Sequence, residues 1–329
     1  MNVTVLGAGS WGTTVAALSA GRNRTTLWAR DEEVAREVEV SSTNSRYLPG
    51  FPLPERLAGT SDLEEAVSAA DVLVVGVPSH GFRAVLEAAK PHVRPWIPVV
   101  SLTKGFEPAT FLRMTEVIRD VLPGRPAAAL TGPNLAKEIM SGGAAASVIA
   151  TEDLTIATEL QRVLRRGVFR IYVNDDVVGC EVGGALKNVI AIATGIAQGL
   201  TVGDNTRAAV ITRGLGELTR LGVAMGGRAA TLAGLAGMGD LIATCTSPQS
   251  RNRYVGEQLG LGRKLEEIIA EMTMVAEGVK TAAAVTDLAA RHGLHLPICQ
   301  VIQQVLAGEL TAAEAYRGLE PAGHELDPG

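Results

Sequence analysis

The chain contains 329 residues, of which 47% are hydrophobic and 20% charged, with 37 glycines and 15 prolines. This length favours two domains, and the composition is that of a folded globular protein, which excludes disordered, collagen-like and disulfide-scaffold classes. The formal net charge of −5 provides no basic surface for nucleic acid or an anionic membrane. We therefore expect a small-molecule partner and no nucleic-acid partner.

The three cysteines, Cys180, Cys245 and Cys299, are isolated, odd in number and without C-x-x-C spacing. This pattern argues against a disulfide framework and a zinc site, and it fits a cytoplasmic protein without a bound metal. The first apolar segment, at 3–6, runs directly into a glycine-rich turn and leaves no room for an export signal. The most apolar later run, at 189–197, is far shorter than the ~20 residues that span a bilayer, so we expect no membrane insertion.

Residues 1 to about 180 alternate short β-branched runs with amphipathic segments, which predicts a doubly wound parallel sheet with crossover helices. Thr60 or Ser61 and Thr151 are the N-caps that we expect for two of these helices. The expected strands are 3–6, 25–28, 72–76, 99–101, 127–130, 146–150 and 168–173. The expected helices are 12–22, 31–40, 63–69, 80–89, 109–121 and 153–164.

From about residue 176 to residue 317, apolar residues follow the 3.6-residue period of helices, interrupted by short Gly or Pro turns. The sequence therefore predicts an α/β protein with a Rossmann-like N-terminal domain at 1–180 and an all-helical C-terminal domain at 181–318. We expect the remaining segment, 319–329, to be a disordered tail, because Pro321, Gly323 and Pro328 interrupt it.

The segment Gly7-Ala8-Gly9-Ser10-Trp11-Gly12 follows the first expected strand and opens the first expected helix. Gly7 allows the tight turn, Gly9 lets the backbone approach a pyrophosphate, and Gly12 lets the helix pack closely on the strand. Free N–H groups and the positive dipole end of the helix favour the pyrophosphate. The segment predicts that residues 1–180 bind NAD(P); a purely structural glycine turn is the alternative.

A cation stands where a nucleotide-binding domain specific for NAD or FAD carries an acid. The second expected strand ends in Leu27-Trp28-Ala29-Arg30-Asp31, and Arg30 could pair with a 2′-phosphate. NADP is therefore favoured over NAD, and FAD is disfavoured. Two alternatives stay open: Arg30 could be a solvated residue at the start of a charged helix, and Asp31 could still reach the ribose and allow NAD.

Two further segments follow expected strands at the edge where a doubly wound sheet binds its ligands. Lys104 lies in Leu102-Thr103-Lys104-Gly105 and is a candidate for binding a phosphate of substrate or cofactor, with a surface lysine as the alternative. Asn134, in Gly132-Pro133-Asn134, either caps a helix or contacts a ligand.

Lys187 and Asn188 lie in an otherwise small and apolar helical segment that begins at Gly183. A buried ammonium is costly unless it is paired or used, so Lys187 is the best acid/base candidate in the chain. Asp240, in Gly237-Met238-Gly239-Asp240-Leu241, is its expected partner. This pair makes 181–318 the substrate-binding domain, with a purely structural Lys–Asp pair as the alternative.

The segment from Ser247 to Arg253 has the pattern of a helix start capped from Ser247, with Arg251 and Arg253 in the first turn. Such a helix start suits an anion. A solvated helix end explains the same residues equally well.

Taken together and in this order, the motifs resemble the NAD(P)-dependent sn-glycerol-3-phosphate dehydrogenases of the bacterial biosynthetic type. The resemblance spans residues 3 to about 317. It rests on Gly7-Ala8-Gly9-Ser10-Trp11-Gly12, Val77-Pro78-Ser79, Thr103-Lys104-Gly105, Gly132-Pro133-Asn134, Leu186-Lys187-Asn188, Gly237-Met238-Gly239-Asp240-Leu241 and Ser250-Arg251-Asn252.

The resemblance implies a fold like that of 6-phosphogluconate dehydrogenase and reversible reduction of dihydroxyacetone phosphate to sn-glycerol 3-phosphate. It also implies NADPH as the favoured cofactor with NAD possible, a role in glycerophospholipid synthesis, a cytoplasmic location and a homodimer. The alternatives are a related two-domain hydroxy-acid or opine dehydrogenase and a non-catalytic NADP-sensing protein.

By the same resemblance, Lys187 is the proton donor or acceptor, and Lys104, Asp240 and Thr244 complete the catalytic group. The implied substrate contacts are Lys104, Gly132, Asn134, Lys187, Asp240, Ser250, Arg251 and Asn252. The implied cofactor contacts are Gly7, Gly9, Ser10, Trp11, Gly12, Arg30, Tyr47, Lys104, Asn134, Ala136, Arg251, Val275 and Glu277. Many family members have Ser or Thr at the position of Asn134, so this chain departs from the common pattern there.

Overall fold

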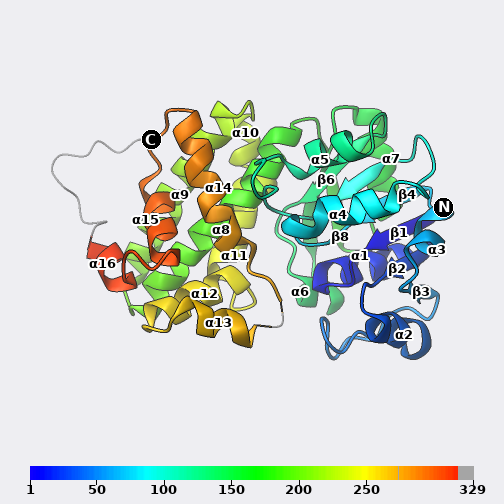
Figure 1. The fold of residues 1–329 in the computed structure, drawn as a ribbon, viewed down its shortest axis with the longest axis horizontal. Helices are drawn as coiled ribbons and strands as arrows, with labels where there is room; N and C mark the ends of the chain where they lie inside the picture. Colours follow the sequence, from blue (N-terminus) through cyan, green and yellow to red (C-terminus); the bar gives the residue numbers. More distant parts are fainter. Residues whose placement is uncertain (273, 318–329) are drawn as a thin grey trace. The chain divides into compact units, whose positions relative to one another are not determined.

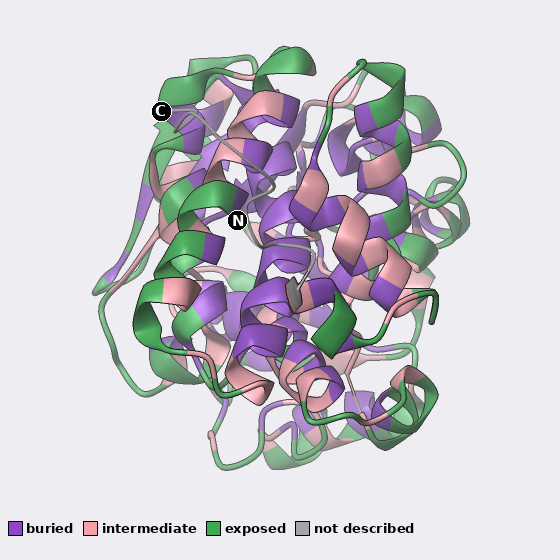
Figure 2. Cartoon of the chain, turned by 90° about the vertical axis from the view of Figure 1, so that its left-hand side faces the viewer, coloured by how far each residue is buried: buried purple, intermediate pink, exposed green. Residues whose placement is uncertain are grey.

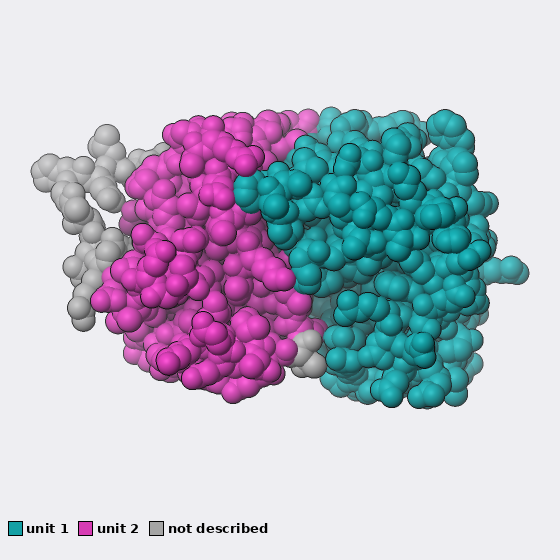
Figure 3. All heavy atoms as spheres, viewed as in Figure 1, with its two compact units in different colours: residues 1–177 teal, residues 178–329 magenta. Residues whose placement is uncertain are grey.

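A computed structural model describes residues 1–272 and 274–317 of the chain. Contacts divide it into two compact units, Met1–Val177 and the part that begins at Val178 (Figure 3). The first unit contains the whole β-sheet, and every described element of the second unit is helical. The expected fold class, a Rossmann-like sheet followed by an all-helical region, is therefore confirmed. The expected tail at 319–329 lies outside the described residues.

The first unit is built on an eight-stranded sheet with the strand order β3-β2-β1-β4-β5-β6-β7-β8 (Figure 1). Strands β1 to β6 pair in parallel, β7 is antiparallel to β6, and β8 is parallel to β7. The strands are β1 (Asn2–Leu6), β2 (Arg24–Trp28), β3 (Leu57–Thr60), β4 (Val72–Val75), β5 (Val99–Ser101), β6 (Ala127–Thr131), β7 (Ala145–Ala150) and β8 (Phe169–Asn174).

Helices cover both faces of this sheet, and each face has its own apolar core. Residues of α1, α2, α6 and α7 pack on one face, and residues of α3, α4 and α5 pack on the other. Figure 2, which faces the second unit, shows buried residues on the inner sides of its helices and exposed residues on their outer turns. The helices are α1 (Ser10–Ala20), α2 (Glu32–Ser41), α3 (Leu63–Ser68), α4 (Ser79–Ala89), α5 (Met114–Val121), α6 (Ala136–Met140) and α7 (Leu154–Leu164).

The expected parallel sheet is confirmed for β1 to β6, whereas β7 and β8 run in the opposite direction, and two elements were missed. Strand β3 has the sequence LAGT, which carries little β-branched signal, and it forms because it pairs with β2 at the sheet edge. Helix α6 has only five residues, too few for a periodic pattern. The expected caps were also wrong, because the side chains of Asp62 and Asp153 accept the first-turn N–H groups of α3 and α7.

The prediction of a helix over 109–121 was wrong in its first third. Helix α5 begins at Met114, after Arg113 and Glu116 have formed a capping box. Before it, Ala109 and Phe111 have φ values of 71° and 60°, which side chains with a Cβ rarely adopt. Tertiary ion pairs hold the segment before α5, and its sequence pattern does not make it a helix.

The second unit is organised around α8 (Val177–Gly199), a 23-residue helix. Two helical stretches of the described chain are long and apolar enough to cross a membrane, Val177–Gly199 and Ala229–Thr246, and 94% of the apolar window of the first is buried, as in a core helix. The remaining helices are α9 (Asp204–Ala224), α10 (Ala229–Leu232), the π-helix η1 (Leu235–Gly239), α11 (Asp240–Thr246), α12 (Arg251–Gly260), α13 (Leu265–Glu271), α14 (Glu277–Arg291), α15 (Pro297–Leu306) and α16 (Ala312–Arg317).

Candidate active site

The glycine-rich turn has the geometry that its sequence predicts. Gly7 has φ +110°, and Gly9 is the N-cap of α1. A Cβ at Gly12 would lie 2.0 Å from the Gly7 carbonyl oxygen, so only glycine allows the helix to start this close to β1. Because Gly9 has no side chain, no side-chain oxygen caps the first N–H groups of α1. The start of α1 therefore lacks a side-chain cap that would compete with an anion, as a pyrophosphate site requires.

A segment that follows α2 is fixed against this turn. Asn44 is fully buried, and its amide donates to the Ala8 carbonyl and to Thr13 Oγ1, both at 2.9 Å. Its Oδ1 accepts from the Tyr47 backbone N–H, and Ser10 Oγ donates to the Tyr47 carbonyl at 2.5 Å. Ser10 and Tyr47, two expected cofactor contacts, are thus brought together. Sequence reasoning did not single out Asn44, which brings them there.

At the carboxyl end of β2, Arg30 is exposed and has no ion pair with any residue that the structure describes. Asp31 is fully engaged. Its Oδ1 caps α2 by accepting from the N–H groups of Glu33 and Val34, and its Oδ2 pairs with Arg46 Nη1 at 2.7 Å. The cation is therefore the available group at this strand end, which fits a 2′-phosphate better than a ribose hydroxyl.

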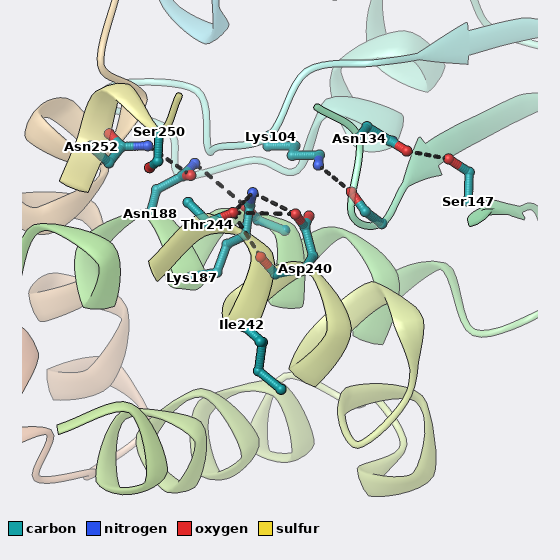
Figure 4. Close-up of polar contacts among 12 residues, drawn as sticks. Lys104, Asn134, Ser147, Lys187, Asn188, Asp240, Ile242, Thr244, Ser250 and Asn252 are labelled. Atoms are coloured by element: carbon teal, nitrogen blue, oxygen red, sulfur yellow. Dashed lines mark hydrogen bonds and ion pairs between the residues drawn. The ribbon is translucent and has the colours of Figure 1, made fainter. Parts of the chain in front are cut away.

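Lys104 donates from Nζ to the Gly132 carbonyl oxygen at 2.8 Å (Figure 4). Gly132 has φ +122°, and a Cβ there would lie 3.2 Å from the Ala146 carbonyl oxygen. Two segments that follow β5 and β6 thus meet at one edge of the sheet, as the sequence predicts. The side chain of Thr103 braces the first segment by donating to the Val77 carbonyl at 2.6 Å.

An ion-pair cluster holds the strained segment after Lys104. Arg83 on α4 forms two parallel hydrogen bonds with Glu107, at 2.7 and 3.0 Å, and a third with Asp120 on α5 at 2.5 Å. Glu107 also accepts from Thr110 Oγ1. The Arg83 guanidinium holds the pKa of the Glu107 carboxyl below its usual value. Because Glu107 is buried and ionised against Arg83, it anchors this segment to two helices.

Two expected ligand contacts carry buried donors without an acceptor among the described residues, the indole Nε1 of Trp11 and the amide Nδ2 of Asn134. Trp11 packs edge-on against Phe169, with ring centroids 6.0 Å apart. Asn134 does not cap α6, whose N-cap is Leu135, and its Oδ1 accepts from Ser147 Oγ (Figure 4). Since buried donors are rarely left unpaired, these two indicate a ligand site in the first unit.

In the second unit, the ammonium of Lys187 is buried between two acceptors. Nζ lies 2.6 Å from Asp240 Oδ1 and 2.6 Å from Thr244 Oγ1, and all three residues are at least nine-tenths buried. Thr244 donates its own proton to the Asp240 carbonyl at 2.7 Å, which turns an oxygen lone pair toward the lysine. The third N–H of the ammonium has no acceptor among the described residues. Ile242 lies on α11 with Asp240 and Thr244, and its side chain points away from Lys187 (Figure 4).

The chain reaches this geometry through close helix packing. A Cβ at Gly183, one turn before Lys187 on α8, would lie 2.8 Å from the Ala236 carbonyl oxygen in η1. Glycine therefore lets the π-helix approach α8, and Asp240 follows directly at the start of α11. A π-turn next to functional groups is a recurrent arrangement, because it redirects the side chains that follow it.

A second polar group links three helices. Asn252 on α12 donates to Asn188 Oδ1 on α8 at 2.9 Å, and its own Oδ1 accepts from the Gly278 N–H at the start of α14 (Figure 4). The motif Leu186-Lys187-Asn188 does not predict a role for Asn188. Its signal was its place beside Lys187 as a second polar residue in an apolar helix. Glu277, an expected cofactor contact, is the first residue of α14.

The expectation for residues 247–253 was wrong in two details. The N-cap of α12 is Ser250, whose Oγ accepts from the Arg253 N–H, and not Ser247. The Arg253 guanidinium is already engaged, because it binds the Ser247 carbonyl and Glu257. Only Arg251 remains as the exposed cation at this helix start, and its Nη1 donates to the Val275 carbonyl at 2.7 Å.

Cys245 adjoins the lysine group but is chemically quiet. Burial raises the pKa of its thiol to about 11. The thiol therefore stays protonated near neutral pH and does not serve as a nucleophile.

Family models match both units. The description "NAD-dependent glycerol-3-phosphate dehydrogenase N-terminus" applies to residues 2–157, and the corresponding C-terminus to residues 176–317.

Curated proteins match over nearly the full length of the chain. A protein of Sphingopyxis alaskensis named glycerol-3-phosphate dehydrogenase (NAD(P)+) 2 is 57% identical over 100% of this chain and 99% of its own length. A Mycobacterium bovis protein named glycerol-3-phosphate dehydrogenase (NAD(P)+) 1 is 53% identical over 98% of this chain and 96% of its own length. The crystal structure of glycerol-3-phosphate dehydrogenase from Coxiella burnetii superimposes with a TM-score of 0.92 at 36% identity, covering 97% of this chain and 98% of that one.

Proposed function

The chain belongs to the NAD-dependent glycerol-3-phosphate dehydrogenase family, and on that premise we propose that it interconverts dihydroxyacetone phosphate and sn-glycerol 3-phosphate with NAD(P)H. It is an oxidoreductase whose product enters glycerophospholipid synthesis. The observation that carries the site assignment is the buried ammonium of Lys187, which is held by two acceptors and keeps one donor for a ligand. A ketone oxygen that becomes an alkoxide needs such a donor.

In the proposed mechanism Lys187 gives a proton to the substrate oxygen during reduction and takes it back during oxidation. Asp240 and Thr244 hold Nζ in place, so the ammonium need not reorganise as negative charge develops on the substrate. Asp240 also balances the lysine charge, which would otherwise be costly at this depth. These three residues are the catalytic group in the second unit.

The substrate phosphate is assigned to the start of α12. Ser250 is the N-cap, and Arg251 and Asn252 are the first two helical residues. A helix of ten residues with an arginine in its first turn favours a dianion through its N–H groups and the guanidinium. Because the Asn252 side chain binds Asn188 and Gly278, its role toward substrate is to offer the second N–H of its amide.

The first unit fits a nicotinamide dinucleotide. The groups that would hold it are the N-terminal end of α1, the Trp11 indole N–H, which has no acceptor among the described residues, and the Arg30 guanidinium. Gly7, Gly9, Gly12, Ser10 and Tyr47 would complete the site. Lys104, Gly132, Asn134, Ala136, Val275 and Glu277 are further contacts that family membership supports. When bound, the cofactor supplies or accepts the hydride.

Family membership favours this activity over a hydroxy-acid or opine dehydrogenase and over a non-catalytic NADP sensor. It also supports a homodimer that works in the cytoplasm, and the three buried free cysteines suit a reducing compartment. Sedimentation at micromolar protein would test the dimer.

The experiment that tests the function is oxidation of NADPH on addition of dihydroxyacetone phosphate, compared with unphosphorylated dihydroxyacetone and a panel of 2-keto acids. We expect rapid oxidation with the phosphate ester and little with the others. Preference for a 2-keto acid, or no oxidation with any substrate, would contradict the proposal.

A further inference from the structure

A second cation, Arg46, lies against Asp31, the residue that follows Arg30 after the carboxyl end of β2. The Arg46 guanidinium is 2.7 Å from the carboxylate of Asp31, the residue next to Arg30 in the chain. The Cζ atom of this guanidinium lies 5.3 Å from the centre of the Tyr47 ring. Neither the glycine motif nor the strand-end pattern pointed to Arg46, because it lies fifteen residues further along the chain than Asp31.

The position of Arg46 is set by hydrogen bonds of the neighbouring residues, and not by the ion pair alone. Asn44 ties the segment to the Ala8 carbonyl and Thr13 Oγ1, and the Tyr47 carbonyl accepts from Ser10 at the start of α1. On its other side, Glu37 of α2 accepts from the N–H and hydroxyl of Ser45 and from Thr43 Oγ1. Arg46 therefore projects from a backbone segment that is braced against the proposed pyrophosphate turn.

The charges in this group suit a phosphate on the ribose. Arg30 has no ion pair among the described residues, and Arg46 is balanced by one carboxylate that also caps α2. An arriving dianion would compete with Asp31 for the Arg46 fork, and guanidinium groups bind phosphate bidentately. Nearly half of the Arg46 side chain is exposed, so the guanidinium can turn without unfolding the segment.

We propose that Arg46 is the second ligand of the NADPH 2′-phosphate, beside Arg30, and that Asp31 is the competing anion that limits the preference for NADPH over NADH. The inference rests on the proposed function, since it concerns the cofactor of that reaction. It assigns cofactor specificity to a residue outside the strand end where such residues are ordinarily sought.

The test is the dissociation constant of each cofactor, measured by isothermal titration calorimetry without substrate and at fixed ionic strength. Arg46→Gln should raise the Kd for NADPH about 10-fold, the effect of losing one charge-assisted contact of ~1.4 kcal/mol, and change the Kd for NADH less than about 2-fold. Arg36→Gln is the matched control, because it removes the same charge from an exposed position on α2. It should leave both constants within about 2-fold of wild type.

Asp31→Asn should act in the opposite direction. Asparagine keeps an oxygen for the cap of α2 but removes the competing charge, so NADPH binding should tighten about 3-fold while NADH binding does not tighten. Thermal unfolding of each free variant, within a few degrees of wild type, would show that the segment is intact.

If Arg46→Gln lowered the affinity for both cofactors equally, or for neither, the assignment of Arg46 would be overturned. Weaker NADPH binding in Asp31→Asn would overturn the competing role of Asp31. If wild type bound neither nucleotide, the proposed function itself would fail. Binding of both nucleotides by wild type, combined with an unselective Arg46→Gln, would contradict this inference alone.

Discussion

In the first unit, the indole of Trp11 and the amide of Asn134 are buried donors without an acceptor among the described residues. In the second unit, the buried ammonium of Lys187 has both an anion and a hydroxyl at 2.6 Å, and Asn252 is bonded on both sides. An unpaired buried donor costs ~1–3 kcal/mol, whereas a paired one contributes ~0.5–1.5 kcal/mol to stability. The first unit thus carries a free-energy cost that a ligand can remove. The polar groups of the second unit are preorganised by hydrogen bonds within the protein.

This contrast separates two kinds of functional residue. Removing an unpaired donor from the first unit should lower ligand affinity without lowering the stability of the free protein. Removing one member of the paired group in the second unit should harm both, because the partner is left buried and uncompensated. Single substitutions in each unit test that separation.

Lys187→Ala should lower the reduction rate by ~10²–10⁴-fold, the contribution of a positioned general acid, and leave NADPH affinity near wild type. It should also destabilise the protein by ~3–5 kcal/mol, because Asp240 is left without its counter-charge. Single-turnover kinetics and urea unfolding measure the two effects.

The double variant Lys187→Ala/Asp240→Asn separates the loss of rate from the loss of stability. It removes the unpaired charge, so much of the lost stability should return while the rate stays low. A rate near wild type in either variant would contradict the role of Lys187 in proton transfer.

Arg251→Ala should lower kcat/KM for dihydroxyacetone phosphate by ~10–150-fold, since a charge-assisted hydrogen bond contributes ~1.5–3 kcal/mol. Activity on unphosphorylated dihydroxyacetone should change much less. Arg253→Ala is the matched control, because its guanidinium is bound to Ser247 and Glu257. NADPH affinity is measured separately by fluorescence titration. Equal losses on both substrates at unchanged NADPH affinity would show that this helix start does not bind the phosphate.

Glu107→Gln should loosen the segment that carries Lys104, lowering stability near neutral pH by ~1–3 kcal/mol and kcat/KM by up to about 10-fold. Arg83 holds the pKa of Glu107 below its usual value of 4.5. The stability that the ionised carboxylate contributes is therefore complete above that value and is lost as the pH falls through the lower pKa of the folded state.

Urea unfolding between about pH 5 and pH 3 tests this dependence, and the acid-induced loss of stability should be smaller in Glu107→Gln than in wild type. Asp120→Asn is the control, since it removes the more exposed partner of Arg83 and should cost at most ~1 kcal/mol. An unchanged pH profile in Glu107→Gln would contradict the assigned ion pair.

Trp11→Phe should have the smallest effect and the most specific one. It keeps an aromatic ring against Phe169 but removes the unpartnered N–H, so the free protein should keep its stability within ~1 kcal/mol while NADPH affinity falls several-fold. Trp28→Phe is the matched control, because its indole donates to the Ser61 carbonyl at 3.0 Å. It should lose stability and retain NADPH affinity. The reverse pattern would remove the basis for a ligand at Trp11.

Much of the fold could be predicted because local chemistry decides it. The glycine turn between β1 and α1 needs residues without a Cβ, and the buried central strands are continuous apolar runs. The edge strand β3, the antiparallel β7 and the unwound residues before α5 escaped prediction. Each depends on pairing or ion pairs with residues far away in the chain, which no local pattern reports.

For the candidate site, the candidate residues could be predicted from the sequence, since a lysine, an aspartate and an arginine among glycines and apolar residues are costly unless they are used. The pairing of these groups became visible with the fold: Thr244 beside Lys187, Asn188 with Asn252, Arg253 with Glu257, and Arg46 with Asp31. The physical reason is that hydrogen bonds and ion pairs act over a few ångströms in space, while the residues that form them are separated by up to 64 positions in the chain.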